Sequence, residues 1–461
     1  MLDHQSSSTF PVPTSSVAAE PAVKLETVNA TTTSTAARTT LNTRQKTPFT
    51  KDFILLAVTQ LTSLFGNQVL RYALPLYLLI ETGSAALFGS IMAASFIPML
   101  VVFPIGGIIA DRVNKRNIMI VLDSCTALLI LAFNVLSGVF DVVPLIAATM
   151  ILLFGIYGAY QPAVMSSVPV LIDSEHILQA NSIIDLISSS AGIAGPVLGG
   201  VLFSVFGLKP ILYASIACFA LSALVEVFMQ IPHQKSQTQG NALLLGLTDL
   251  KESFAFLFLK QPILWKVALV YSSTNLLLSS LVMIAVPVVI TQHLGFEPDL
   301  ANRLYGYAQG VIASGAVLGG LLVGILSKRL KPQASPFILA ASAFSILIAG
   351  FALHLLSNSY ASFALMIIGC GLMLVMSTLF QIQMLTYIQV LTPVHLTGKV
   401  ISSVMCLCMC ASPLGQLIYG LVFDSIGYRV FIPFYIAFGV MLIIIFLTRQ
   451  VFKQLTQLVQ D

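Results

Sequence analysis

The sequence predicts an all-α integral membrane protein of twelve transmembrane helices, arranged as two pseudo-symmetric six-helix bundles. Three observations support this fold class. The 461 residues are 57% hydrophobic and only 9% charged, whereas a soluble domain carries about 25% charged residues because its surface faces water. Apolar stretches of about 20 residues, the length that spans a hydrocarbon core, recur along the chain. Motifs in the first half of the chain return in the second half at matching spacing.

The apolar stretches divide the chain into two sets of six spans. The first set is expected at 52–80, 85–110, 117–139, 142–166, 176–206 and 209–231, and the second at 263–292, 303–327, 334–356, 359–388, 398–422 and 429–451. The expected organisation is therefore a disordered Ser/Thr-rich tail over 1–50, a bundle over 51–231, a linker over 232–262, a bundle over 263–452 and a tail over 453–461. Within the linker, residues 241–260 have the apolar spacing of an amphipathic helix that lies on the membrane surface.

Basic residues predict how the chain is oriented in the membrane. With twelve spans both termini lie on one side, and eighteen Lys and Arg residues fall on that side. The opposite side has three, which are Lys209, Arg303 and Arg429, and Arg71 lies within the first span. The positive-inside rule then places both termini in the cytoplasm and the protein in the cell membrane.

The two halves repeat each other in parallel. Paired glycines precede a basic pair after the second span and again after the eighth. Four residues near the end of span five recur 220 positions later in span eleven: Gly200, Phe203, Gly207 and Lys209 match Gly420, Phe423, Gly427 and Arg429. Such a duplication is typical of transporters whose substrate site lies near the midplane between the halves.

Two motifs have a mechanical interpretation. After span two, Gly107 permits close helix contact, Asp111 can accept hydrogen bonds or pair with a cation, and Arg112, Lys115 and Arg116 anchor the loop to the cytoplasmic side. We interpret this segment as a gating loop, although a plain positive-inside loop would also have such residues. In span five, Gly195, Pro196, Gly199 and Gly200 allow close packing and a bend.

Both motifs resemble those of the major facilitator superfamily. The segment Gly107 to Arg116 resembles the hallmark loop between spans two and three, with Asn114 at the position that is usually Gly. Since Asn tolerates left-handed backbone geometry, we expect the turn to survive. The run from Gly195 to Gly200 resembles the superfamily's antiporter motif, which occurs mainly in exporters.

The wider resemblance covers roughly residues 50–450 and is to the macrolide-efflux and siderophore-exporter branch. It is carried by Asn67, Arg71 and Leu74-Pro75 in span one, with Gln161-Pro162-Ala163 and Leu396 to Val400 further on. This resemblance implies the major facilitator fold and proton-driven efflux. The chain lacks the span-four arginine of many proton-coupled exporters, so its coupling uses other groups or does not use protons.

Charged residues within spans are candidates for coupling, because a charge at membrane depth usually faces a cavity or a partner. Arg71 is the first candidate, although its depth also permits snorkelling to the outer interface. Asp123 could couple or pair with a cytoplasmic cation such as Arg112. Asp185 lies two turns into span five, where a desolvated carboxyl could carry a proton. Glu226 and His354 lie near span ends and are expected at the membrane interface.

Polar and aromatic residues on the expected central helices are candidates for a substrate pocket, because such groups suit amphipathic organic compounds. Helix packing would use the same residues, and we expect about half to line the cavity. They are Asn67, Tyr72, Tyr157, Tyr160, Asn275, Gln381, Gln383 and Tyr387.

Together these features predict a secondary transporter that exports a hydrophobic or amphipathic compound, exchanges it for protons and alternates access between its halves. Uptake or export of a specific metabolite or siderophore is an alternative, and a non-transporting sensor or membrane enzyme is a third. The sequence contains no hydrolase or Walker motif, so we expect no enzymatic activity, no cofactor and no nucleic-acid partner. We expect no metal either, because only Cys406 and Cys410 of the C-x-C-x-C run share a helix face. The expected partners are a small-molecule substrate, protons and the lipid bilayer, with the protein a monomer.

Overall fold

Twelve helices in the described part of the chain are long and apolar enough to cross a membrane, which confirms the predicted fold class. The computed structural model describes residues 49–173, 176–232, 262–326, 332–392 and 394–460, apart from some side chains such as that of Asp111. The tail expected over 1–50 lies almost wholly outside the described residues, and so does the amphipathic helix expected over 241–260.

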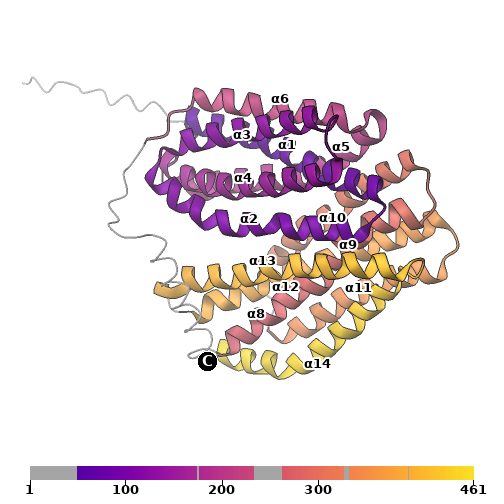
Figure 1. Cartoon of the computed structure of the whole chain (residues 1–461). Coiled ribbons are helices and arrows are strands. Elements are labelled where there is room, and N and C mark those ends of the chain that lie inside the picture. The colour runs from indigo at the N-terminus through magenta and orange to yellow at the C-terminus, as the bar shows by residue number, and fades with distance from the viewer. Residues whose placement is uncertain (1–48, 174–175, 233–261, 327–331, 393, 461) are drawn as a thin grey trace, which may run out of the picture. The chain divides into compact units, whose positions relative to one another are not determined.

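Six spans form the N-terminal bundle, which is drawn in indigo to magenta in the upper half of Figure 1. They are α1 (Lys51–Thr82), α2 (Ala85–Arg112), α3 (Lys115–Leu136), α4 (Val142–Leu171), α5 (Ile177–Phe206) and α6 (Leu208–Val227). Thr50 caps the start of α1 with its side chain, and Gly83 ends that helix with φ of 62°. A glycine is favoured there because it adopts this left-handed conformation without steric cost.

The other six spans form the C-terminal bundle. The seventh is one continuous span, Pro262–His293, built from α8 (Pro262–Thr274), the π-helix η3 (Asn275–Ser279), α9 (Ser280–Val288) and the π-helix η4 (Val289–His293). The rest are α10 (Pro298–Leu326), the short 3₁₀ helix η5 (Pro332–Ala334), α11 (Ser335–Leu355), α12 (Ser359–Leu391), α13 (Val394–Ile426) and α14 (Ile432–Gln460). Serine supports the η3 turn, because the Ser280 hydroxyl lies 2.8 Å from the Asn275 carbonyl oxygen and donates to it.

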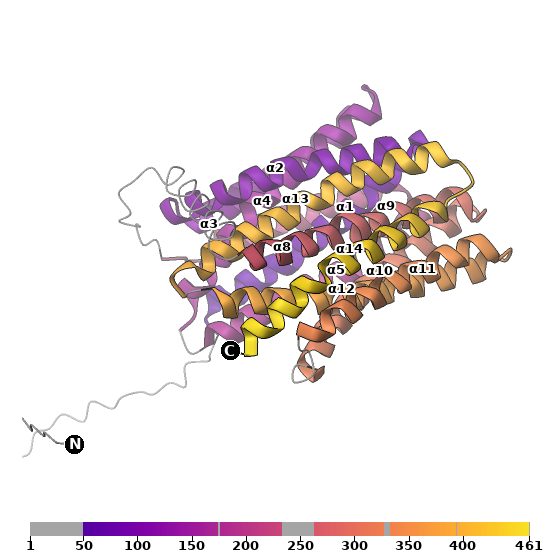
Figure 2. The same ribbon diagram turned by 90° about the horizontal axis from the view of Figure 1, so that it is seen from below.

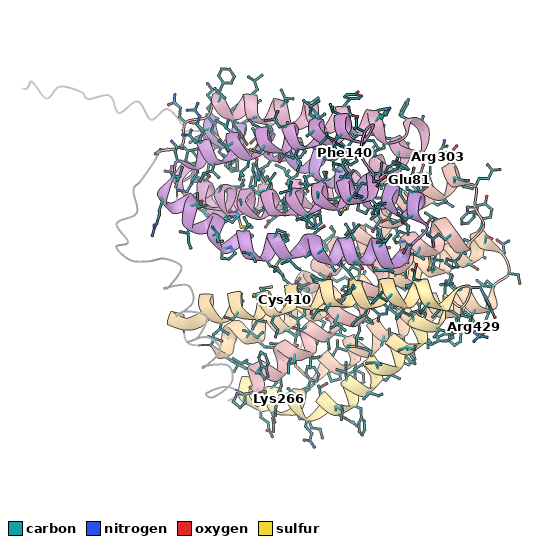
Figure 3. All side chains as sticks on the ribbon, viewed as in Figure 1. Glu81, Phe140, Lys266, Arg303, Cys410 and Arg429 are labelled. Carbon is teal, nitrogen blue, oxygen red and sulfur yellow. The ribbon has the colours of Figure 1, made fainter. Side chains whose placement is uncertain are left out.

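Two helix pairs make the main contacts between the bundles in the described part of the chain: α2 packs against α13, and α5 packs against α10. Figures 1 and 2 both show α2 and α13 side by side. We call the end at which α1 begins and α14 ends the terminal end, and the opposite end the distal end. Figure 3 shows Glu81, Arg303 and Arg429 at the distal end and Lys266 towards the terminal end.

Pairs of glycines bring the bundles together near the distal end. A Cβ placed on Gly200 of α5 would lie 2.7 Å from the Gly306 Cα of α10, and one placed on Gly89 of α2 would lie 2.9 Å from the Gly420 Cα of α13. Larger residues would therefore force the helices apart. The two contacts are related by the internal duplication, since Gly200 and Gly420 occupy matching positions in the two halves.

Polar contacts between the bundles lie near the distal end as well. Asp424 of α13 accepts hydrogen bonds from the Ser84 hydroxyl and from the Ala85 backbone N–H at 2.9 Å, so it caps the start of α2. Arg303 of α10 donates to the Ser204 hydroxyl of α5 at 2.7 Å. These bonds and the glycine pairs close the distal end.

One face of α5 marks where the bundles separate. Near the distal end this face contacts α10, through Val197 and Gly200. Towards the terminal end the same face continues at helical spacing with Asp185, Ser182 and the half-buried Ser188 nearby, and Asp185 and Ser182 are exposed. A polar stripe on a membrane helix usually faces a cavity or a partner.

Candidate functional site

Two buried carboxyl groups lie in the core of the N-terminal bundle. Asp123 of α3 is 2% exposed and Glu226 of α6 is 0% exposed. The Ser63 hydroxyl of α1 donates to Asp123 Oδ1 at 2.9 Å, and the Tyr160 hydroxyl of α4 donates to Glu226 Oε1 at 3.0 Å. The Ser222 hydroxyl of α6 donates to the Thr59 carbonyl of α1 at 3.3 Å. Four helices therefore contribute to one polar centre inside an apolar bundle.

The two carboxyl groups keep unused hydrogen-bonding capacity. Asp123 Oδ2 and Glu226 Oε2 are buried without a hydrogen-bond partner. Within the described residues neither group forms an ion pair, although the sequence suggested a cation such as Arg112 as a partner of Asp123. Buried charges without a cation are costly, and such groups cluster at functional sites.

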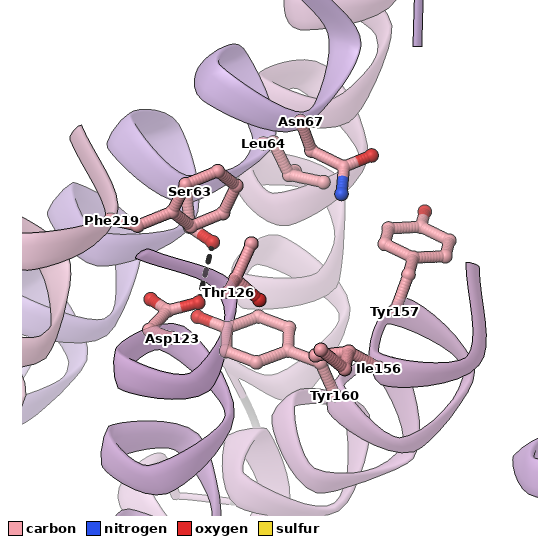
Figure 4. Close-up of a pocket in the computed structure, with 9 residues that line it drawn as sticks. All are labelled: Ser63, Leu64, Asn67, Asp123, Thr126, Ile156, Tyr157, Tyr160 and Phe219. Atoms are coloured by element: carbon pink, nitrogen blue, oxygen red, sulfur yellow. Dashed lines mark hydrogen bonds between the residues drawn. The ribbon is translucent and has the colours of Figure 1, made fainter. Parts of the chain in front are cut away.

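A small cavity adjoins Asp123 (Figure 4). Its volume of about 10 Å³ is close to the least that holds one water molecule. Asn67 lines the cavity and is 6% exposed, and its Oδ1 is buried without a hydrogen-bond partner. Ser63, Leu64, Asn67, Asp123, Thr126, Ile156, Tyr157, Tyr160 and Phe219 line it. Three of the pocket candidates, Asn67, Tyr157 and Tyr160, are thus brought together around the Asp123 carboxyl.

Arg71 lies one turn beyond Asn67 on α1 and is held by aromatic rings. Its guanidinium carbon lies 4.0 Å from the centroid of the Phe154 ring and 5.3 Å from that of Tyr157. Both rings belong to α4, so the cation is stabilised by two π faces. Because Tyr157 contacts both Arg71 and the cavity, the first coupling candidate and the carboxyl centre are physically connected.

The remaining candidates lie elsewhere. Asp185 is exposed on the α5 face described above, so it is not desolvated as expected. Tyr72 lies between the bundles, where its hydroxyl donates to the Asn302 carbonyl at 2.9 Å and its ring stacks on Tyr305 with centroids 4.7 Å apart. It therefore belongs to the distal closure.

Four candidates belong to the C-terminal bundle. Asn275 donates to the Tyr271 carbonyl at 3.3 Å, and Gln381 contacts the Tyr271 side chain. Gln383 accepts a hydrogen bond from Ser335 at 3.1 Å and donates one to the Tyr387 hydroxyl at 3.1 Å. These amide and hydroxyl groups bond within their own bundle, and the structure does not bring them to the Asp123 centre.

The gating loop differs in detail from the expectation. The close contact is made by Gly106, whose added Cβ would lie 2.9 Å from the Ala159 Cα, whereas one on Gly107 would lie 4.0 Å from Pro162. Asn114 has φ of −60° and caps α3, so its tolerance of left-handed geometry is not used. The side chain of Asp111 is outside the described residues, and Lys115 is buried while Arg112 is exposed.

Arg116 links the loop to the carboxyl centre. Its guanidinium donates to the backbone carbonyls of Glu226 and Val227, at 3.2 Å in the case of Glu226. These are the last carbonyls of α6, which lack partners within the helix. Arg116 thus fixes the end of α6 and with it the position of Glu226.

Glu226 is the residue that sequence reasoning missed. Its position near the end of a span suggested the membrane interface, but the side chain turns into the bundle. A signal was available, because Ser215, Ser222 and Glu226 follow one another at intervals of seven and four residues, which places them on one face of α6. All three are buried.

The antiporter-like run in α5 forms helix contacts. A Cβ on Gly195 would lie 2.6 Å from the Gln68 Cβ, and one on Gly199 would lie 3.1 Å from the Tyr72 ring, so both glycines let α5 approach α1. Gly200 and the Pro196 carbonyl contact Gly306 of α10. This run therefore packs at the junction of the two bundles.

Two duplicated helical bundles, with a polar centre buried in one of them, are typical of membrane transporters. The sequence matches the model of the Major Facilitator Superfamily over residues 56–414, and the chain belongs to that family. The predicted family is therefore confirmed, and the chain is a transporter and not an enzyme.

Curated relatives and solved structures agree with this assignment. The multidrug efflux pump Tap of Mycolicibacterium fortuitum is 23% identical over 383 residues, which cover 81% of this chain and 90% of Tap. Macrolide efflux protein A of Streptococcus pyogenes is 24% identical over 386 residues, covering 80% and 88%. The crystal structure of the nucleoside transporter NupG is 14% identical, covers 88% of this chain and 100% of that chain, and has a TM-score of 0.68. This last likeness shows the fold alone.

Proposed function

We propose that this transporter exports small hydrophobic or amphipathic compounds in exchange for protons, by alternating access between the two six-helix bundles. The distal contacts support the alternating-access part of the proposal, because the glycine pairs and the bonds of Asp424 and Arg303 lie near one end of the bundle pair, as one access state requires. The names of the efflux relatives favour export of drug-like compounds.

The orientation follows from the basic residues. If both termini are cytoplasmic, as the positive-inside rule predicts, the distal end faces outwards and the exposed α5 stripe faces the cytoplasm. This state would accept a compound from the cell interior. Alternation would then break the Asp424 and Arg303 contacts and bring the terminal ends of the bundles together.

Coupling is proposed to involve Arg71, Asp123 and Asp185, and the substrate is proposed to contact the pocket candidates that face the space between the bundles. Tyr157 is the pocket candidate best placed to connect substrate binding with coupling, since it touches Arg71 and the Asp123 cavity inside the N-terminal bundle. A half-buried aromatic ring beside a cation suits amphipathic organic compounds.

Everted membrane vesicles test the proposal, with erythromycin and ethidium as probes. In such vesicles export becomes uptake, and we expect an imposed pH gradient to drive accumulation of at least one probe. Accumulation that persists after nigericin collapses the gradient would contradict proton coupling. Accumulation no greater than in vesicles without the protein, together with an unchanged resistance profile of a pump-deficient host across toxic compounds, would contradict drug export.

A further inference from the structure

The buried carboxyl groups of Asp123 and Glu226 would be unfavourable if both were ionised. Two ionised carboxylates in the bundle core would place two negative charges near each other, at 2% and 0% exposure, with no ion pair among the described residues. Like charges in a low-dielectric interior repel strongly, and desolvation adds to the cost. Binding a single proton would remove one of the two charges.

We infer that Asp123 and Glu226 together bind one proton, and that a water molecule in the adjacent cavity connects this centre to Asn67. That the proton is the one exchanged during transport rests on the proposed function, whereas its binding by the pair does not. The centre takes up the proton from water as an O–H bond on one carboxyl oxygen. On release, the electron pair of that bond stays on the oxygen and the proton returns to water.

Hydroxyl groups connect the two carboxyls. Tyr160 donates to Glu226 at 3.0 Å and Ser63 donates to Asp123 at 2.9 Å. Figure 4 shows the Tyr160 hydroxyl beside the Asp123 carboxyl. Chains of hydroxyls that both donate and accept can pass a proton between their ends. The proton is therefore shared by the pair.

Other ionisable groups of the packed helices occupy distinct places. On α3 the Arg116 guanidinium binds the main-chain carbonyls of Glu226 and Val227 and forms no ion pair with either carboxyl. On α1 the Arg71 guanidinium lies over Phe154. The remaining ionisable side chains of these four helices are Lys51, Asp52, Tyr72, Tyr77 and Glu81 on α1, Lys115 and Cys125 on α3, Tyr157 on α4, and Lys209, Tyr213 and Cys218 on α6.

The cavity gives the centre a route towards the substrate. Asp123 Oδ2 and Asn67 Oδ1 both need a hydrogen-bond donor and both residues line the cavity. A water molecule with such partners and that much room is a normal part of a buried polar site. Tyr157 completes the route, because it lines the same cavity and touches Arg71.

Infrared difference spectroscopy of the purified full-length protein, between alkaline and acidic buffer, tests proton binding without any substrate. A protonated buried carboxyl gives a carbonyl stretching band that shifts in deuterium oxide. We expect this band in the wild type, and we expect its frequency or the pH at which it appears to change in both Asp123→Asn and Glu226→Gln. An unchanged band in either variant would overturn the shared proton. Asp141→Asn and Glu297→Gln, which change exposed carboxyls, are the controls and should retain the band.

Two further variants keep the test decisive if an isosteric change prevents folding. Tyr160→Phe retains both carboxyls and removes the hydroxyl that donates to Glu226, so the band should shift; an unshifted band would contradict the hydroxyl link. Asn67→Leu fills the cavity and removes the acceptor. After transfer into deuterium oxide, the exchange-induced shift of the carbonyl band should therefore develop more slowly. An unchanged exchange rate would rule out the water route.

Transport separates this inference from the proposed function. In everted vesicles with ethidium, Asp123→Asn should lose accumulation driven by a pH gradient and keep exchange between labelled and unlabelled ethidium. Wild-type vesicles that show no gradient-driven accumulation would contradict the proposed antiport, while the infrared result would still decide whether the pair binds a proton. Gradient-driven accumulation that persists in Asp123→Asn would overturn the exchange role of the pair.

Discussion

Individual residues show two different ways of keeping charge inside a membrane bundle. The Arg71 cation lies against the faces of Phe154 and Tyr157, whereas the carboxyls of Asp123 and Glu226 rely on hydroxyl donors. The cation and the carboxyl centre share α1 and α4 as their framework. A movement of Tyr157 would therefore affect both, which is the property that coupling between a substrate and a proton needs.

The contact between Arg71 and Phe154 is expected to be measurable in the free energy of unfolding. A desolvated cation–π contact contributes about 2 kcal/mol, and a double-mutant cycle isolates it. We expect Phe154→Leu and Arg71→Met to show a coupling energy of about 2 kcal/mol, measured by unfolding in mixed micelles. Phe140→Leu, at a ring that is 62% exposed, is the control. Additive effects of the two changes would show that the contact contributes nothing.

Transport should depend on two of the charged coupling candidates, Arg71 and Asp185. We expect Arg71→Ala and Asp185→Asn each to reduce ethidium accumulation in everted vesicles, because one removes the cation beside Tyr157 and the other removes the carboxylate of the exposed α5 face. Membrane insertion should be unaffected, as judged by the amount of protein in washed membranes. Full transport by both variants would remove these residues from the mechanism.

The sequence reveals part of this site and conceals the rest for physical reasons. Asp123 stands out because a carboxyl in the middle of an apolar span needs an explanation. Glu226 does not, because a residue near a helix end can reach either the interface or the core. The spacing of Ser215, Ser222 and Glu226 on one face of α6 is the local indication that it faces the core. The contact of Arg116 with the end of α6 joins two helices and has no signature in the local sequence.

At the scale of helices, α5 contacts the other bundle with its distal half and exposes polar side chains on its terminal half. Its distal glycines contact α1 and α10, and its terminal half presents polar residues on the continuing face. The existence of all twelve spans could be predicted from apolar length. The ends of the spans were predicted less accurately, because helices extend past the apolar stretch where capping and packing support them. For example, α4 continues to Leu171 and α10 begins at Pro298.

A bulky residue at the glycine contact should prevent distal closure. In Gly200→Leu the new side chain would meet the Gly306 backbone, since even a Cβ would lie 2.7 Å from its Cα. We expect transport to be lost, and spin labels at Glu81 and Tyr428 to move apart, in a protein whose six native cysteines have been replaced. Gly320→Leu on α10, where nothing lies within 4 Å of an added Cβ, is the matched control. Unchanged label distances in Gly200→Leu would contradict the proposed closure.

At the scale of the whole chain, the internal duplication is expressed as two similar bundle contacts but not as two similar cores. Gly200 and Gly420 occupy matching contacts at the distal end. The carboxyl centre of α3 and α6, in contrast, is not repeated in their counterparts α11 and α14, whose described residues contain no Asp or Glu. Both bundles therefore contribute to the distal contacts, whereas the proposed proton-binding pair lies in the N-terminal bundle. This division fits a transporter in which one half carries the coupling ion and both halves form the gate.

The direction of transport depends on how the whole molecule is oriented. Because eighteen basic residues lie on the side of the termini and three on the other, we expect both termini in the cytoplasm. Green fluorescent protein fused to the C-terminus should fluoresce, since it folds in the cytoplasm, whereas alkaline phosphatase fused there should be inactive. The reverse pattern is expected for fusions made after Gly207, between α5 and α6. An active C-terminal phosphatase would invert the orientation, and the terminal end beside Asp185 would then receive compounds from outside, so the same structure would support uptake.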